Sequence, residues 1–540
     1  MTSVPAYHVA EISFVAKVDH EDPCASLRLD VLFTPPSGNT LRVPGFWAGG
    51  RTWKVRYSSG ETGEHTYHTV CSDKSDEGLH GLEGKLVVTE YAGANALYRH
   101  GPVVVGPTKR FLQHADGIPF FWLGDTWWMG LCKRLKWPEE FQQLTADRKA
   151  KGFTVVQIVA GLYPDMGAFD ERGANEAGFP WEPEWRAIRP EYFDRADVRI
   201  RHLVESGIVP CIVGAWGYYL PWLGSERMKR HWRYVIARWG AYPVVWCIAG
   251  EVNLPWYLLP GFPYDDREAV KGWTEIAAYV RGTDPFRRPI SVHPTGLGRM
   301  SARGAIDDQT LLDFDMLQTG HGDRDSLGPT VETVRWSYAA EPTMPVINSE
   351  VNYEGILGRC HDDVQRLMFW ACVLNGACGH TYGANGIWQM NEKDRPFGNS
   401  PHGGTYGPTP WQEAMALPGS TQLGRAKALL ERYPWYEFVP HPEWAAYAGG
   451  FQARDAYHVP HAAGIEGKVR FVYAPQGHPL ELRALGGSRW KARAYDFGSN
   501  VEKDLGRLDA SPAGQITIKR PFPDDPKRPE QDWLLVLEAD

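Results

Sequence analysis

The chain has 540 residues, of which 43% are hydrophobic and 23% charged, and its formal net charge is −8 at pH 7. This length is too great for one compact core and predicts several domains. The lysine and arginine residues form no basic stripe along the sequence, so nucleic acid is not an expected partner. No run approaches the ~20 apolar residues of a membrane span, so a membrane is not an expected partner either.

The first residues, MTSVPAYHVAEISFVAKVDHEDP, carry charged side chains where a signal peptide needs an unbroken apolar stretch. Eight cysteines are scattered along the chain without a C-x-x-C pair, and three of them lie inside apolar runs. Such cysteines are typical of buried thiols in a reducing compartment. We therefore expect a cytoplasmic protein.

Residues 1–97 alternate between polar and apolar side chains in short runs such as SLRLDVLFTP, TWKVRYSS and GKLVVTEY. Turn clusters such as PPSGN and SSGETG separate these runs. This pattern predicts a small immunoglobulin-like β-sandwich.

Residues 98–432 have a different hydrophobic pattern, in which short apolar runs alternate with longer stretches of helical periodicity. The predicted strands lie at 120–125, 154–161, 209–217, 244–251, 289–294, 314–321, 345–350 and 376–383. Eight such units predict an α/β fold of the (β/α)8 TIM barrel type. A doubly wound open sheet is the alternative, but it normally has a glycine-rich phosphate loop after its first strand, where this chain reads GDTWW.

Residues 433–540 return to strand alternation, in runs such as GKVRFVYAP, RWKARAYDF and DWLLVLEAD. We predict a second β-sandwich here. The aromatic junction ERYPWYEFVPHPEW indicates that this domain packs against the barrel as a support rather than moving on a flexible linker.

Polar side chains gather at the carboxyl ends of the predicted barrel strands, where active sites of such barrels form. Two of them are glutamates: Glu251 follows the fourth strand in VVWCIAGEVN, and Glu350 ends the seventh in PVINSEVNYEG. Cleavage of a glycosidic bond requires one carboxyl group that donates a proton and a second that is ionised. The two glutamates, with aromatic residues between them, therefore predict a carbohydrate-cleaving site.

The motifs QHADGIPFFWLGDTWWMGL, DRKAKGFTVVQIV, VVWCIAGEVN, PVINSEVNYEG and GHTYGANGIW together resemble the apiosidase-like glycoside hydrolases, whose catalytic barrel is of the DUF4038 type. The resemblance covers most of residues 95–400. It implies an acid/base at strand 4, here Glu251, and a nucleophile at strand 7, here Glu350. Two positions depart from the pattern: Gly250 stands where related retaining barrels have asparagine, and Glu251 stands where the apiose-cleaving members are expected to have aspartate.

The remaining rim residues are predicted to bind substrate: Asp125, Trp127, Trp128, Trp216, Asn253, His293, His321, Tyr353, His380, Tyr382 and Trp388. Asp125 would accept hydrogen bonds from sugar hydroxyls or, alternatively, cap the following helix. The tryptophans would stack on sugar rings or simply pack, and the histidines would contact substrate or orient Glu350. No H-x-H or H-E-x-x-H spacing is present, so we predict neither a metal nor a cofactor.

These observations predict an exo-acting, retaining glycoside hydrolase that releases a terminal sugar, such as a furanoside, from an oligosaccharide or glycoside. Three alternatives remain at this point: an endo-acting glycosidase on a short glucan or arabinan, a barrel that only binds carbohydrate, and a metal-dependent amidohydrolase. The sequence also allows a homo-oligomer.

Overall fold

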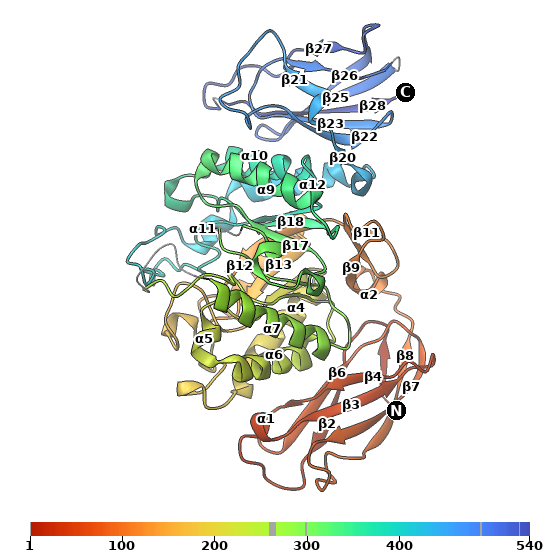
Figure 1. The fold of residues 1–540 in the computed structure, drawn as a ribbon, viewed down its shortest axis with the longest axis vertical. Coiled ribbons are helices and arrows are strands. Elements are labelled where there is room, and N and C mark those ends of the chain that lie inside the picture. The colour runs from red at the N-terminus through yellow and green to blue at the C-terminus, as the bar shows by residue number, and fades with distance from the viewer. Residues whose placement is uncertain (1, 259–265, 297–299, 487–488, 529) are drawn as a thin grey trace.

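The computed structural model describes residues 2–258, 266–296, 300–486, 489–528 and 530–540 (Figure 1). Its central sheet contains eight parallel strands: β12 (Trp122–Trp127), β13 (Val155–Val159), β14 (Val209–Val213), β15 (Val245–Cys247), β16 (Ile290–Ser291), β17 (Asp315–Gln318), β18 (Val346–Glu350) and β19 (Gly379–Tyr382). Each lies within or overlaps a predicted strand.

The sheet curls into a barrel because the first strand of the series pairs with both the second and the last, β12 with β13 and β19. Among the described residues, β16 and β17 form no ladder. Single hydrogen bonds of 2.8 Å bridge this seam: from the Asp313 N–H to the Ile290 carbonyl, from the Ile290 N–H to Asp313 Oδ2, and from Ser291 Oγ to the Phe314 carbonyl. The prediction of a (β/α)8 barrel is therefore confirmed, with a barrel that is nearly closed.

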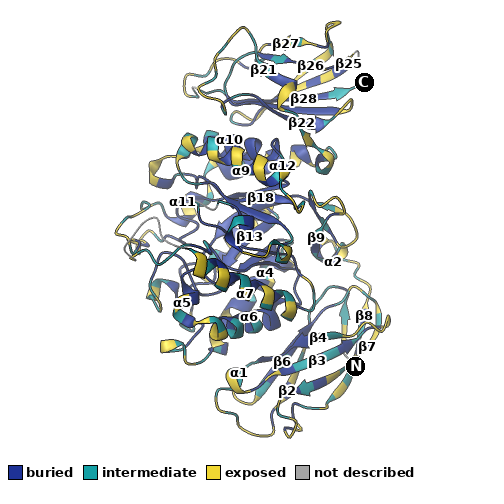
Figure 2. Ribbon diagram, viewed as in Figure 1, coloured by how far each residue is buried: buried dark blue, intermediate teal, exposed yellow. Residues whose placement is uncertain are grey.

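Helices follow the strands and cover the barrel: α3 (Glu139–Ala150), α4 (Pro190–Glu205), α5 (Tyr219–Leu223), α6 (Ser225–Trp239), α7 (Arg267–Thr283), α8 (Ala302–Ala305), α9 (Leu327–Ala339), α10 (Asp362–Val373), α11 (Trp411–Met415) and α12 (Pro418–Leu430). Helix α6 shows why they pack: Met228, Trp232, Val235 and Trp239 recur at helical spacing and are all buried. Figure 2 shows that the barrel strands are buried, whereas the outer faces of the covering helices are exposed.

The N-terminal part contains two facing sheets around one core. Strands β1 (Thr2–Pro5), β8 (Glu83–Thr89), β7 (Gly63–Cys71), β3 (Leu29–Thr34) and β4 (Leu41–Pro44) form one sheet, and β2 (Ala10–Val15), β6 (Thr52–Tyr57) and β5 (Phe46–Trp47) form the other. Phe14, Val31, Phe33, Trp53 and Val55 meet between the sheets. Short helices α1 (Pro23–Ser26) and α2 (Ala96–Arg99) flank these strands.

The C-terminal part has a similar layout. Strands β20 (Val439–Pro440), β22 (His461–Ile465), β23 (Val469–Ala474), β28 (Trp533–Ala539), β25 (Arg489–Asp496) and β26 (Val501–Asp509) form one sheet, and β21 (Ala445–Tyr447), β24 (Leu480–Leu482) and β27 (Ile516–Ile518) form the other. Trp490, Trp533 and Leu535 belong to their shared core.

Buried ion pairs join both outer parts to the barrel. Arg56 of β6 donates a hydrogen bond of 2.6 Å to Asp197 of α4, and Arg238 of α6 donates to the same carboxylate at 2.8 Å. At the other end, Arg366 of α10 binds Asp532 with two hydrogen bonds of 2.8 and 2.7 Å. Removal of one partner from such a pair would leave the other charge buried and unpaired, which is costly. These contacts therefore fix how the two outer parts dock on the barrel.

The sequence pattern did not predict a small sheet that lies just before the barrel in the chain. A three-stranded sheet of β9 (Val103–Val105), β10 (Leu112–His114) and β11 (Pro119–Phe120) precedes the barrel. Phe120 therefore belongs to this sheet, whereas the sequence pattern assigned it to the first barrel strand. The barrel strand begins two residues later, at Trp122.

Candidate active site

A pocket of about 330 Å³ lies at the carboxyl ends of the barrel strands. Its lining consists of Trp128, Pro164, Asp165, Trp216, Glu251, Leu254, Tyr257, Thr295, Gly296, Gln318, Gly320, His321, Glu350, Tyr353, Ile356, Trp388 and Tyr406. Seven of the predicted site residues are among them: Trp128, Trp216, Glu251, His321, Glu350, Tyr353 and Trp388. The pocket volume is in the usual range for a small-molecule site.

Glu251 stands four residues beyond the end of β15, with a left-handed backbone at φ 42°. The preceding residue is tied to the neighbouring strand loop, since Gly250 N–H donates to the Ala215 carbonyl and Gly217 N–H to the Gly250 carbonyl, at 2.9 and 2.8 Å. The Trp216 indole then donates a hydrogen bond of 3.1 Å to Glu251 Oε2. The position of this carboxyl group is thus set by the loop after β14.

The same tryptophan explains why Gly250 replaces the asparagine expected from the family pattern. A β-carbon on Gly250 would stand 2.2 Å from the Trp216 ring, far inside van der Waals contact. No side chain fits there unless the indole moves.

Glu350 is the last residue of β18 and its side chain is buried. His321 Nε2 lies 2.8 Å from Glu350 Oε1, within hydrogen-bond distance. His293 Nε2 lies 3.4 Å from Glu350 Oε2, a close contact rather than an aligned hydrogen bond, while His293 Nδ1 lies 3.0 Å from the Pro294 carbonyl. Two imidazoles therefore face this carboxyl group.

Gln318, the last residue of β17, connects the two acids. Its amide nitrogen is 3.1 Å from Glu251 Oε1 and 3.1 Å from Glu350 Oε1. A side-chain amide has two N–H bonds, so one nitrogen can donate to both carboxyl groups. The two acceptor oxygens consequently lie no farther apart than twice that distance.

The surroundings separate the acidities of the two groups. Burial, and secondarily the negative charge of Glu350, raises the pKa of Glu251 to about 7. Burial also favours the neutral form of Glu350, but His293 and His321 outweigh it and lower the pKa of Glu350 to about 2. At pH 7 the pocket therefore holds an ionised Glu350 beside a Glu251 that keeps its proton in about half of the molecules, and in more of them at lower pH.

Aromatic side chains wall the pocket around these acids. Trp128 donates a hydrogen bond of 2.9 Å from its indole to the Tyr353 hydroxyl, and its ring meets Trp216 edge to face at 5.4 Å. Tyr353 stacks on Trp388 at 6.1 Å, and Trp388 meets Tyr406 at 5.4 Å. Burial and the Glu350 charge raise the pKa of Tyr353 well above its usual range, so this phenol keeps its proton.

Six predicted binding residues do not line the pocket, and for these the expected direct contact with substrate is corrected. Asp125 is fully buried: Arg148 donates to its Oδ2 at 2.5 Å, the Trp127 indole donates to the same oxygen at 2.8 Å, and the Thr126 N–H donates to Oδ1 at 2.9 Å. It neither faces the pocket nor caps a helix. Trp127 is equally buried and packs edge to face on Phe141.

The other four lie behind the pocket wall. Tyr382 donates from its hydroxyl to Glu354 at 2.5 Å, and Asn253 accepts from the Thr295 N–H at 3.2 Å. His380 is fully buried against Phe369, and burial lowers its pKa to about 3, so it is a neutral core side chain. His293 has no exposed surface and lies behind three lining residues, since its ring contacts Glu350, Trp128 and Trp216.

The predicted set also omitted several lining residues, chiefly Gln318, Asp165, Tyr257 and Tyr406. Gln318 ends a barrel strand and Asp165 follows one, so their position relative to the strands was an available signal. Tyr257 and Tyr406 come from long loops, where sequence position gives no such signal.

Among the described residues, no cluster of three or more histidine, cysteine, aspartate or glutamate side chains could hold a metal ion. Within the same part of the chain, no helix is both long and apolar enough to cross a membrane.

Comparison with known proteins identifies the fold and the family. A family model for the apiosidase-like catalytic domain matches residues 107–437. The chain belongs to the apiosidase-like family. It is accordingly a glycoside hydrolase with a carbohydrate substrate, and the predicted resemblance is confirmed. A second model, for a domain of unknown function (DUF5060), matches residues 3–72.

Solved structures share the architecture of this apiosidase-like protein. One, named glycoside hydrolase, has a TM-score of 0.67 at 24% identity and covers 81% of this chain and 97% of its own. A family 5 glycoside hydrolase from Bacteroides vulgatus has a TM-score of 0.68 at 23% identity, and the match covers 82% of this chain and 94% of that one. Another structure from that organism covers both chains completely, with a TM-score of 0.69 at 19% identity. No curated protein matches the chain.

Proposed function

We propose that this apiosidase-like protein is a retaining, exo-acting glycoside hydrolase that removes a terminal sugar, such as a furanoside, from an oligosaccharide or glycoside. The observation that carries the proposal is the Gln318 amide, which contacts both Glu251 and Glu350 at 3.1 Å. Retaining enzymes hold their carboxyl groups about 5 to 5.5 Å apart, whereas inverting enzymes leave about 6.5 to 9.5 Å for a water molecule. Because Gln318 contacts both acids at 3.1 Å, Glu251 Oε1 and Glu350 Oε1 lie no farther apart than twice this distance, and this short separation favours retention.

In the first step, Glu350 attacks the anomeric carbon as the ionised nucleophile while the bond from this carbon to the leaving oxygen breaks. Glu251, whose pKa is raised to about 7, transfers its proton to that oxygen. In the second step, Glu251 takes a proton from water, the water oxygen bonds to the anomeric carbon, and Glu350 leaves as a carboxylate. The sugar is released with its original anomeric configuration.

The pocket shape supports exo action. A volume of about 330 Å³, walled by Trp128, Trp216, Tyr353 and Trp388, suits the end of a saccharide better than a continuous polymer. Cytoplasmic action on small glycosides is also part of the proposal, and it is supported by eight free thiols, seven of them buried.

The experiment that tests the proposal is a screen of 4-nitrophenyl glycosides, furanosides included, with wild type, Glu251→Gln and Glu350→Gln. Wild type should cleave at least one glycoside, and NMR should show the retained anomer first. Both variants should lose cleavage by several orders of magnitude but still bind the sugar. Unchanged cleavage in either variant would remove that glutamate from the mechanism, and a first-formed inverted anomer would exclude retention.

Single-sugar release from a labelled oligosaccharide would support exo action. Internal cleavage products would instead identify an endo-acting enzyme.

A further inference from the structure

We propose that Asp165 is a sugar-recognition residue of this pocket, whose carboxyl group binds hydroxyls of a neutral sugar and excludes sugars that bear a carboxylate. The inference rests on the proposed function, because it assumes that the sugar next to the scissile bond occupies this pocket. Asp165 lines the pocket together with Glu251 and Glu350 and would be its third acid.

The burial of Asp165 indicates a missing partner. The residue is 6% exposed, and its Oδ1 makes no hydrogen bond of normal geometry within the described part of the chain, although the Ser400 side chain lies near this carboxyl group. A buried acceptor without a partner is costly, and native proteins rarely leave one unless a ligand or water completes it. Because Asp165 faces the pocket, a hydroxyl-bearing ligand there would satisfy it.

The loop that carries Asp165 is held firmly in place. The Tyr218 hydroxyl lies 2.8 Å from the Tyr163 carbonyl and 3.2 Å from the Met166 carbonyl, so it binds the chain on both sides of Asp165. Arg172 donates to the Asp165 carbonyl at 3.4 Å. Asp165 itself has a left-handed backbone at φ 57°, a conformation that costs energy for most residues and that surrounding contacts must maintain.

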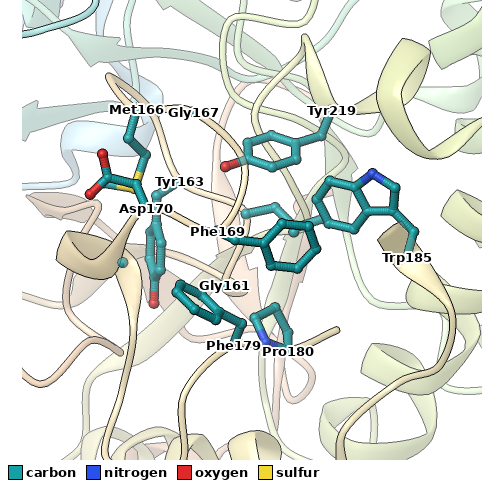
Figure 3. A pocket seen from close by; sticks show the side chains of 12 residues that line it. Gly161, Tyr163, Met166, Gly167, Phe169, Asp170, Phe179, Pro180, Trp185 and Tyr219 are labelled. Atoms are coloured by element: carbon teal, nitrogen blue, oxygen red, sulfur yellow. The ribbon is translucent and has the colours of Figure 1, made fainter. Parts of the chain in front are cut away.

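Aromatic packing next to the pocket anchors the continuation of this loop. Figure 3 shows Phe169, Trp185 and Tyr219 grouped around a small hollow beside Met166 and Gly167. The Phe169 and Trp185 rings are 4.5 Å apart, and the hollow encloses only about 10 Å³, which is no more than one water molecule needs. We therefore assign the hollow an anchoring role, and the pre-formed loop presents Asp165 without a cost of ordering on binding.

Charge makes the recognition selective. No lysine or arginine is present in the pocket lining given by the described residues. Burial raises the pKa of Asp165 to about 6, so at neutral pH much of this side chain is ionised near the ionised Glu350. A sugar carboxylate would meet two negative charges, and the lining histidine His321 is already paired with Glu350 at 2.8 Å. Hydroxyl groups would instead donate charge-assisted hydrogen bonds.

The test uses the full chain with two variants and one control. Asp165→Asn keeps the shape and tolerates a left-handed backbone, and Asp165→Gly removes the side chain while relieving that backbone. The control is Asp22→Asn: Asp22 also has positive φ, at 39°, and its buried Oδ1 has no hydrogen-bond partner among the described residues, but it belongs to the N-terminal part and does not line the pocket. Unfolding midpoints verify that all three proteins fold.

Binding is measured by the tryptophan fluorescence change with D-apiose, L-arabinose, D-xylose, D-glucose and D-glucuronic acid. We expect wild type and Asp22→Asn to bind at least one neutral sugar and to bind glucuronic acid more weakly. Loss of a hydrogen bond to a charged group should weaken neutral-sugar binding about 10- to 100-fold in both Asp165 variants. Unchanged binding in these variants, preference of wild type for glucuronic acid, or no neutral-sugar binding by wild type would each overturn the proposal.

Hydrolysis of the fastest-cleaved 4-nitrophenyl glycoside separates this inference from the proposed function. If Asp165 recognises the sugar, KM rises more than kcat falls in the Asp165 variants. A loss confined to kcat would mean that Asp165 takes part in the chemistry, and it would overturn the recognition role. Sugar binding that depends on Asp165, without any hydrolysis by wild type, would contradict the proposed function alone.

Discussion

The indole ring of Trp216 covers the α-carbon of Gly250, so that a β-carbon there would stand 2.2 Å from the ring. Gly250 directly precedes Glu251, and Trp216 also donates a hydrogen bond to the Glu251 carboxyl group. We predict that Gly250→Ala displaces both groups and lowers kcat by about 100-fold, the usual effect of a misplacement near 1 Å. The unfolding free energy should fall by about 1 to 3 kcal/mol from overpacking.

Gly282→Ala is the matched control. Gly282 lies in α7, and an added β-carbon would meet nothing within 4 Å, so alanine should leave activity intact and stabilise the helix by about 0.5 to 1 kcal/mol. Full activity in Gly250→Ala would show that the Trp216 contact does not position Glu251.

Gln318→Leu tests the amide that joins the two acids. Loss of these hydrogen bonds should lower kcat/KM about 10- to 100-fold. The Gln318 hydrogen bond lowers the pKa of Glu251, so its removal should raise that pKa above about 7. Since Glu251 must be protonated in the first step, the alkaline limb of the pH–rate profile should move to higher pH. Gln142→Leu, on the exposed face of α3, serves as the control, and an unchanged or lower alkaline limb would contradict this role.

His321→Ala tests the ionisation of Glu350. His321 helps to lower the pKa of Glu350 to about 2, against the effect of burial, so its removal should raise that pKa. The nucleophile would then become protonated at a higher pH, and activity should be lost earlier on acidification than in wild type. The comparison of kcat/KM from pH 3 to 7 measures this shift. His321→Gln, which retains a donor, should show a smaller effect, and identical acidic limbs in all three proteins would refute the assignment.

Asp125→Asn distinguishes a structural role from sugar binding. The variant removes the fully buried carboxylate partner of Arg148 and leaves the guanidinium with only the partly exposed Asp147; breaking a buried pair typically costs about 3 to 5 kcal/mol. We expect a lower midpoint in urea unfolding and an unchanged KM. A raised KM with normal stability would instead support the direct substrate contact that the sequence pattern suggested.

The barrel was predictable because its strands are buried on both faces. VPCIV of β14 is a continuous apolar run and VVQIV of β13 is interrupted only by Gln157, and helices with a regular apolar face follow them. The short sheet before the barrel was not separable from β12, because HADGIPFFWLGD reads as one apolar run after a turn. The chain leaves one sheet at Phe120 and enters another at Trp122 without a sequence signal.

The two glutamates were predictable from their place at strand ends, but the residues that tune them were less so. Gln318 has no charge and resembles any polar residue at the end of a strand. The pairing of Asp125 with Arg148 depends on how α3 rotates against β12, which fixes whether an acid at the barrel rim faces the pocket or the helix layer. Only the packed structure decides that choice.

Chemical rescue by azide tests the assignment of the two glutamates most directly. With a cleavable 4-nitrophenyl glycoside, Glu251→Ala should still form the covalent intermediate with Glu350, and azide should then yield a glycosyl azide of retained configuration. In Glu350→Ala, azide should enter the vacated space, attack the substrate itself and yield the inverted product. NMR of the two glycosyl azides gives the configurations; the opposite assignment, or the same configuration from both variants, would contradict Glu350 as nucleophile and Glu251 as acid/base.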